Sequence, residues 1–142
     1  MNFLLDTNVC IALVNGDRDI AGASAIIRQR FIQSRRSGQS LFISSIVVHE
    51  LWYGVSKSER VAINARRLSD FLAREFRVLD FSERDAQTAG EIRAILERKG
   101  QRIGEYDTLI AGQALARGLT LVTANTREFA RVDGLKLADW TQ

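Results

Sequence analysis

The sequence predicts an α/β fold, with residues 1–142 forming a single domain around a central, mainly parallel sheet. Short apolar runs have the length of strands, and longer segments with helical periodicity separate them. This alternation is typical of a parallel sheet with helices on both faces. No repeat, glycine/serine linker or proline divides the chain. The expected strands are Asn2 to Leu5, Leu41 to Ser44, Arg77 to Leu79, Leu119 to Val122 and Lys136 to Ala138.

Three helices can be predicted from the spacing of apolar residues and from their ends. Ser82 is a favourable N-cap, and Lys99 followed by Gly100 marks a helix end. The buried stripe expected between them is Ala86, Ala89, Ile92 and Leu96. A second helix is expected from near Glu59 to Arg74, with a core-facing side made of Val61, Leu68, Phe71 and Leu72. A third is expected from Tyr106 to Arg117, ending at Gly118.

Composition narrows the chemistry that is available. The only cysteine is Cys10 and the only histidine is His49, which excludes an internal disulfide, a cysteine-rich zinc site and a histidine-rich metal site. Any metal must therefore be bound by oxygen. Arginine supplies 17 of the 20 basic residues and the sequence pI is about 9.5, which favours phosphate-bearing partners. The first apolar segment is too short for a signal peptide or a membrane span, so we expect a cytoplasmic protein with no membrane association.

Three acidic residues interrupt apolar segments. Asp6 follows the first strand, Glu50 lies in the helical pattern after the second, and Asp107 begins the helix before the fourth. A carboxylate among buried residues costs several kcal/mol unless a cation compensates. The carboxyl ends of parallel strands share one edge of the sheet, where ligands usually bind. Asp6 and Glu50 should meet there, and Asp107 should join them if its helix approaches that edge with its N-terminus.

Converging carboxylates repel one another unless a divalent ion lies between them. Mg²⁺ prefers oxygen ligands, usually a few carboxylates together with substrate phosphate, and Mn²⁺ is a possible substitute. Such an ion can activate water and neutralise charge on a phosphodiester. Thr123 and Asn125 follow the fourth strand and could position water or a phosphate oxygen, and Glu128 is a possible fourth carboxylate.

Each of these residues also has a structural interpretation. Asp6 and Asp107 each precede a possible helix start and are good N-caps. Glu50 is too deep in its helix for a capping box, but it could pair with a nearby arginine. Thr123 and Asn125 could simply form a turn.

Four segments of the sequence resemble PIN-domain ribonucleases, specifically VapC-type toxins of bacterial type II toxin–antitoxin systems. They are LLDTNV at 4–9, SSIVVHELWYGV at 44–55, IGEYDTLIAGQAL at 103–115 and LVTANTREFARVDGL at 121–135. The resemblance spans nearly the whole chain. It implies a three-layer α/β/α sandwich and Asp6, Glu50 and Asp107 as the Mg²⁺-binding acids.

The same resemblance implies metal-dependent cleavage of cellular RNA, a toxin homodimer, and inhibition by a cognate VapB-type antitoxin in a larger toxin–antitoxin assembly. The chain departs from the family in one place that bears on the site. Many relatives carry a further aspartate after the fourth strand, where this chain has Thr123, Ala124 and Asn125. Asn125 or Glu128 would then have to complete the site.

Two other classes of protein remain compatible with the sequence. A phosphotransfer protein also places an aspartate after the first strand, but it needs a paired acid, or a second aspartate two residues later where this chain has Asn8. A PIN-like domain that binds RNA or a protein partner without cleaving it is the second alternative. RNA cleavage that is abolished by EDTA would distinguish a nuclease from the latter.

Overall fold

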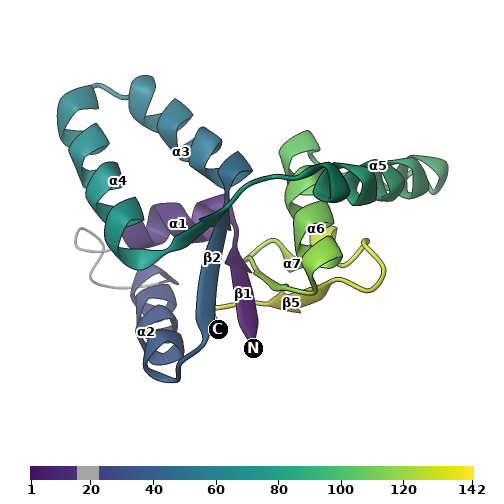
Figure 1. Ribbon diagram of the computed structural model, residues 1–142, viewed down its shortest axis with the longest axis horizontal. Helices are drawn as coiled ribbons and strands as arrows, with labels where there is room; N and C mark the ends of the chain where they lie inside the picture. Colours follow the sequence, from purple (N-terminus) through teal and green to yellow (C-terminus); the bar gives the residue numbers. More distant parts are fainter. Residues whose placement is uncertain (16–22) are drawn as a thin grey trace.

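The computed structural model describes residues 1–15 and 23–142 and shows a parallel sheet with helices on both sides (Figure 1). The strands are β1 (Asn2–Leu5), β2 (Ser40–Ser44), β3 (Arg77–Leu79), β4 (Thr120–Val122) and β5 (Lys136–Ala138). The helices are α1 (Thr7–Val14), α2 (Ala23–Arg36), α3 (Ser45–Ser56), α4 (Val61–Glu75), α5 (Glu83–Arg98), α6 (Glu105–Arg117) and α7 (Thr126–Phe129). In Figure 1, α1 to α4 lie to the left of β1, and α5 to α7 lie to its right.

The five strands run in the order β3-β2-β1-β4-β5, and every neighbouring pair is parallel. Strands β1 and β4 form the centre, with Leu4 opposite Leu121 and Leu5 opposite Val122, all fully buried. Strand order reverses between β1 and β4, because the chain builds outward to β3 on one side and to β5 on the other. The fold class and the five strand positions predicted from the sequence are confirmed, with β2 and β4 shifted by one residue at their starts.

The helix predictions are confirmed in position and corrected in two details. Helix α5 begins after the Ser82 cap and buries Ala89, Ile92 and Leu96, but Ala86 is exposed. Asp85 occupies the buried side of that first turn instead, because it closes a capping box with Ser82.

In α4, Leu68 is buried, and Phe71 and Leu72 are half-buried. The prediction that Val61 faces the core is wrong, since its side chain is 43% exposed. Val61 is the first residue of the helix, and the residues of α4 that pack against the core lie further along it.

Close packing between α5 and α6 fixes the position of α6. A Cβ atom added to Gly112 would lie 2.6 Å from the Cα of Ala89, so the glycine lets the two backbones approach. Asp85, only 1% exposed, accepts hydrogen bonds from the Arg117 guanidinium at 2.9 and 3.2 Å. Helix α6 then ends at Gly118, whose φ of 65° requires the left-handed conformation that glycine adopts freely. The N-terminus of α6, which carries Asp107, is therefore held by contacts made further along the helix.

The core is one apolar cluster that includes both faces of the central strands. Phe3 and Trp140 pack edge to face with ring centroids 5.5 Å apart, which fixes the C-terminal segment against β1. In the described residues, no helix is both long enough and apolar enough to cross a membrane.

Candidate active site

The side chain of Asp6 lies where the strand order of the sheet reverses. It follows β1 directly, and its backbone N–H donates to the Val122 carbonyl of β4 at 3.0 Å. Its carboxylate caps α1 by accepting the Thr7 N–H at 2.7 Å, and its other oxygen accepts the Thr123 hydroxyl at 2.8 Å. Such reversal points form the ligand-binding crevice of open α/β sheets. The N-cap interpretation of Asp6 is therefore correct. One carboxylate oxygen is bound by Thr7, which follows Asp6 at the end of β1, and the other by Thr123, which follows β4.

Glu50 is joined to Asp6 through Thr7. Ser44 caps α3 by accepting the Ile46 N–H at 3.0 Å, which starts the helix at the carboxyl end of β2. Six residues on, the Glu50 carboxylate accepts the Thr7 hydroxyl at 3.0 Å. Thr7 thus contacts Asp6 through its backbone and Glu50 through its side chain. Sequence reasoning missed this role of Thr7, although the residue lies inside the LLDTNV segment.

Asp107 reaches the same edge from the first turn of α6. Helix α6 begins after Gly104, so Asp107 lies within the helix, and the prediction of an N-cap at this position is wrong. A Cβ on Gly104 would lie 3.2 Å from the Asp107 carboxylate, so glycine leaves that carboxylate room. Burial, followed by the charges of Asp6, Glu50 and Glu128, raises the pKa of Asp107 to about 6. The four acids are therefore close enough to act on one another.

The segment after β4 contributes Thr123, Asn125 and Glu128. Thr123 is fully buried and its hydroxyl faces Asp6, while its oxygen accepts the Asn125 backbone N–H at 3.0 Å. The Asn125 side chain donates to the Glu128 carboxylate at 2.9 Å. Thr123 therefore orients Asp6, and Asn125 orients Glu128 beside the other acids.

The electrostatics of this edge suit a cation. Burial raises the pKa of Asp6, and the hydrogen bonds from Thr123 and Thr7 partly oppose that shift. Burial also raises the pKa of Glu50, with a further contribution from Asp6. The donor set is entirely oxygen, which fits Mg²⁺ or Mn²⁺. Among residues 1–15 and 23–142, no three acidic, histidine or cysteine side chains stand together at metal-binding distances.

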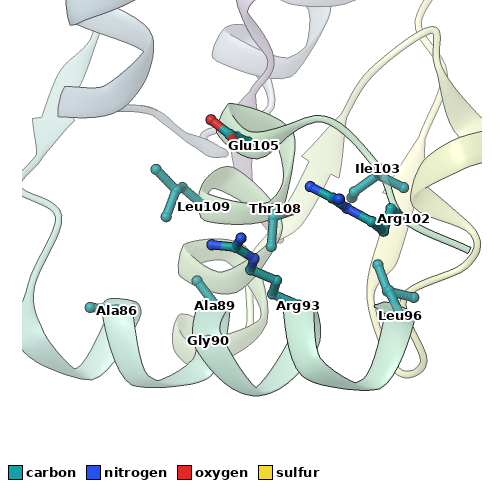
Figure 2. Close-up of a pocket in the computed structure, with 10 residues that line it drawn as sticks. All are labelled: Ala86, Ala89, Gly90, Arg93, Leu96, Arg102, Ile103, Glu105, Thr108 and Leu109. Carbon is teal, nitrogen blue, oxygen red and sulfur yellow. The ribbon is translucent and has the colours of Figure 1, made fainter. Parts of the chain in front are cut away.

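Two hollows of similar volume lie on the described surface. One, of about 320 Å³, lies between α1, α3 and α4 and is lined in part by Glu50. The other, of about 340 Å³, lies between α5 and α6, where Arg93 of α5 faces Thr108 of α6 (Figure 2). Its lining includes Arg102 and Glu105 but none of the candidate ligands. Of these two hollows, the first therefore includes a candidate ligand in its lining and the second does not.

Comparison with known proteins places the chain in a family. The PIN domain family matches residues 3–135. A tRNA(fMet)-specific endonuclease VapC of Shigella flexneri is 40% identical over 141 residues, covering 99% of each chain. Ribonuclease VapC2 of Rickettsia felis is 39% identical over 140 residues, covering 99% of this chain and 98% of the relative.

Solved structures agree with this assignment. VapBC2 from Rickettsia felis, bound to a DNA fragment from its promoter, superposes with a TM-score of 0.87, 38% identity and 99% coverage of both chains. DNA-bound VapBC from Salmonella typhimurium gives 0.85, with 39% identity and coverage of 99% of this chain and 98% of the other. The chain therefore belongs to the PIN-domain family, and within it to the VapC ribonucleases of toxin–antitoxin systems. The predicted class, an endoribonuclease toxin, is confirmed.

Proposed function

We propose that the protein hydrolyses phosphodiester bonds of RNA at the edge formed by Asp6, Glu50 and Asp107, using Mg²⁺ or Mn²⁺. The observation that carries this proposal is that the acids meet at one partly buried edge, where Thr7 joins Asp6 to Glu50 and where burial and the neighbouring charges raise the pKa of Asp107 to about 6. A cluster that repels itself in this way gains free energy when a divalent ion neutralises it. The location at the reversal of strand order supports the same assignment.

The chain's own residues hold the groups that react. A divalent ion, when bound, neutralises charge on the phosphate and lowers the pKa of water. Asp6 and Asp107 are the proposed direct ligands. The Asp6 carboxylate is oriented before any ion binds, because Thr7 and Thr123 each donate a hydrogen bond to one of its oxygens.

Glu50 is proposed to ligate the ion and to orient the attacking water with its two oxygens. Its raised pKa favours accepting the proton that the water loses. The water oxygen forms a bond to phosphorus, one bridging P–O bond breaks, and the departing oxygen takes up a proton. Asn125 and Glu128 complete the rim, with Glu128 as a fourth carboxylate that Asn125 holds in place.

For the substrate, we propose initiator tRNA. The support is the relative from Shigella flexneri, named as tRNA(fMet)-specific and 40% identical along almost the full length of both chains. A second relative, from Salmonella typhimurium, carries the same name at 40% identity over 140 residues. We further propose that a VapB-type antitoxin inhibits the protein, that the toxin is a homodimer within a larger DNA-binding assembly, and that it acts in the cytoplasm where tRNA is found. The VapBC complexes with DNA support the assembly.

The test is cleavage of a tRNA(fMet) transcript, with an elongator tRNA transcript as the comparison. We expect cleavage of the initiator tRNA in Mg²⁺, loss of cleavage in EDTA, and recovery on adding Mg²⁺ or Mn²⁺. Asp6→Asn should abolish cleavage while Asp133→Asn, a change to an acid whose side chain is 88% exposed, should not. Full activity of Asp6→Asn would refute the assigned site, and equal cleavage of both tRNAs would refute the substrate.

A further inference from the structure

Three aromatic rings of the described chain are exposed, and they gather beside the acidic edge. Tyr53 is 62% exposed and Tyr106 is 47% exposed, and the side chain of His49 is exposed as well. All phenylalanine and tryptophan rings in the described part are buried or half-buried. Exposed aromatic rings that cluster in one place are typical of binding surfaces.

The first two rings lie next to the candidate catalytic acids. His49 immediately precedes Glu50 on α3, and Tyr106 immediately precedes Asp107 on α6. Their ring centroids are 5.5 Å apart at an interplanar angle of 43°, so they form one pair across the two helices. The ring pair therefore stands at the rim of the acidic edge.

Helix α3 extends this rim away from the acids. His49, Tyr53 and Lys57 are spaced by four residues and so lie on one side of the helix. The Lys57 ammonium is 4.8 Å from the centre of the Tyr53 ring. At about 1.5 Å of rise per residue, the stripe runs roughly 12 Å from His49 to Lys57. We call His49, Tyr106, Tyr53 and Lys57 the ring track.

We propose that the ring track binds unstacked nucleotides of the RNA on one side of the cleaved phosphate. This inference rests on the proposed function, because it takes the acidic edge as the place of cleavage. Ring faces stack on any base that is free of a duplex, and a cation at the end of the track can contact the backbone phosphate. The proposal thereby assigns base stacking to named side chains outside the acidic edge.

Binding can be measured separately from cleavage. The probe is a fluorescently labelled single-stranded RNA octamer, with Ca²⁺ replacing Mg²⁺ to suppress cleavage and fluorescence anisotropy as the readout. Tyr53→Ala and Tyr106→Ala should each raise Kd about 5- to 150-fold, the range for losing one stacked base. Tyr53→Phe, Tyr106→Phe and His49→Phe keep a ring and should stay within about 2-fold of the parent. Ile95→Ala, which changes an exposed apolar residue of α5, is the matched control.

A second probe tests stacking itself. An octamer without bases should bind the parent protein and the alanine variants equally, because no base is present to stack. Equal losses with the normal and the baseless strand would overturn the proposal, as would equal losses in the phenylalanine and alanine variants. Light scattering gives the mass of each variant. A variant that no longer dimerises but binds the octamer with unchanged Kd would overturn the proposal, because the rings would then belong to a contact between two copies of the protein.

The binding assay also keeps this inference separate from the proposed catalysis. If the alanine variants lose affinity but the parent never cleaves RNA in Mg²⁺, the ring track stands and the proposed reaction fails. If the parent cleaves RNA and the alanine variants bind the octamer normally, the reaction stands and the ring track is refuted.

Discussion

The Thr123 hydroxyl donates a 2.8 Å hydrogen bond to the buried Asp6 carboxylate and so joins the ends of the two central strands. Both side chains are at most 6% exposed, so water does not compete for this bond. The same carboxylate accepts the Thr7 N–H through its other oxygen. Asp6 therefore has little freedom to rotate, which matters for a group that is proposed to hold a metal ion.

Thr123→Val should weaken Mg²⁺-dependent cleavage without unfolding the protein. Valine has a similar shape, but it leaves one Asp6 oxygen without its donor. Loss of a partner that orients a metal ligand typically costs 10- to 100-fold in activity or metal affinity. Cleavage rate as a function of Mg²⁺ concentration checks this, with Thr123→Ser as the control that keeps the hydroxyl. Unchanged Mg²⁺ dependence in Thr123→Val would show that this hydrogen bond has no part in the reaction.

The raised pKa of Asp107 predicts how the metal-free protein responds to pH. Its pKa is about 6 in the folded state against an ordinary value of 3.8, so the folded state binds the proton more tightly. The resulting destabilisation is complete above about pH 6 and disappears as pH falls toward 3.8. A shift of about two units corresponds to roughly 3 kcal/mol, and screening at this half-exposed group reduces that to about 1 kcal/mol.

The measurement is urea unfolding in EDTA at pH 5 and pH 7.5. Asp107→Asn should be more stable than the parent at pH 7.5 by about 1 kcal/mol, and that advantage should shrink at pH 5. Added Mg²⁺ should favour the parent over the variant. An Asp107→Asn protein that is less stable than the parent at pH 7.5 in EDTA would contradict the cost of burial and of charge repulsion on which this expectation depends.

Gly112→Ala should strongly destabilise the protein. The new Cβ would meet the Ala89 backbone at 2.6 Å, which forces α5 and α6 apart. Overpacking of this kind typically costs 1–3 kcal/mol and occasionally more. Gly90→Ala is the control, because nothing lies within 4 Å of its new Cβ and α-helical glycine costs roughly 0.5–1 kcal/mol relative to alanine. Thermal unfolding should show opposite shifts for the two variants, and a shift in the same direction would count against this packing.

Arg117→Leu should destabilise the protein by leaving the buried Asp85 carboxylate without its cation. Burial alone would raise the pKa of Asp85, but its hydrogen bonds with Arg117 and Ser82 outweigh burial and lower it. Removing one partner of a buried pair typically costs about 3–5 kcal/mol. The stability that Asp85 contributes should therefore be present at neutral pH and lost as pH falls through its lowered pKa. Urea unfolding of parent and variant at pH 7 and pH 3 checks both statements, and equal stability at pH 7 would refute them.

Much of the fold was predictable because burial imposes simple patterns. The central strands β1 and β4 are buried on both faces and read as short apolar runs, and all five strands were located to within a residue. The end of α6 at Gly118 followed from the same kind of local signal. Ala86 was assigned wrongly because periodicity counts apolar side chains and ignores a polar group such as Asp85, which is buried for its hydrogen bonds. Val61 was assigned wrongly because it is the first residue of α4 and is exposed there.

The candidate site was predictable in its acids and not in their partners. Asp6, Glu50 and Asp107 stood out as charges within apolar segments, and the topology brings them to one edge. That they bind metal stays a prediction. The hydrogen bonds from Thr7 to Glu50 and from Thr123 to Asp6 depend on the relative placement of α1, α3 and β4, which no local pattern encodes. Asn125 likewise contacts Glu128 only because a short turn separates them.

The most direct test of the account is Mn²⁺ binding, measured by electron paramagnetic resonance, beside cleavage of the tRNA(fMet) transcript by the same preparations. The account predicts that Asp6→Asn and Asp107→Asn lose Mn²⁺ binding and cleavage together, while Asp133→Asn keeps both. An Asp6→Asn protein that no longer binds Mn²⁺ but still cleaves the transcript at the parent rate would contradict it.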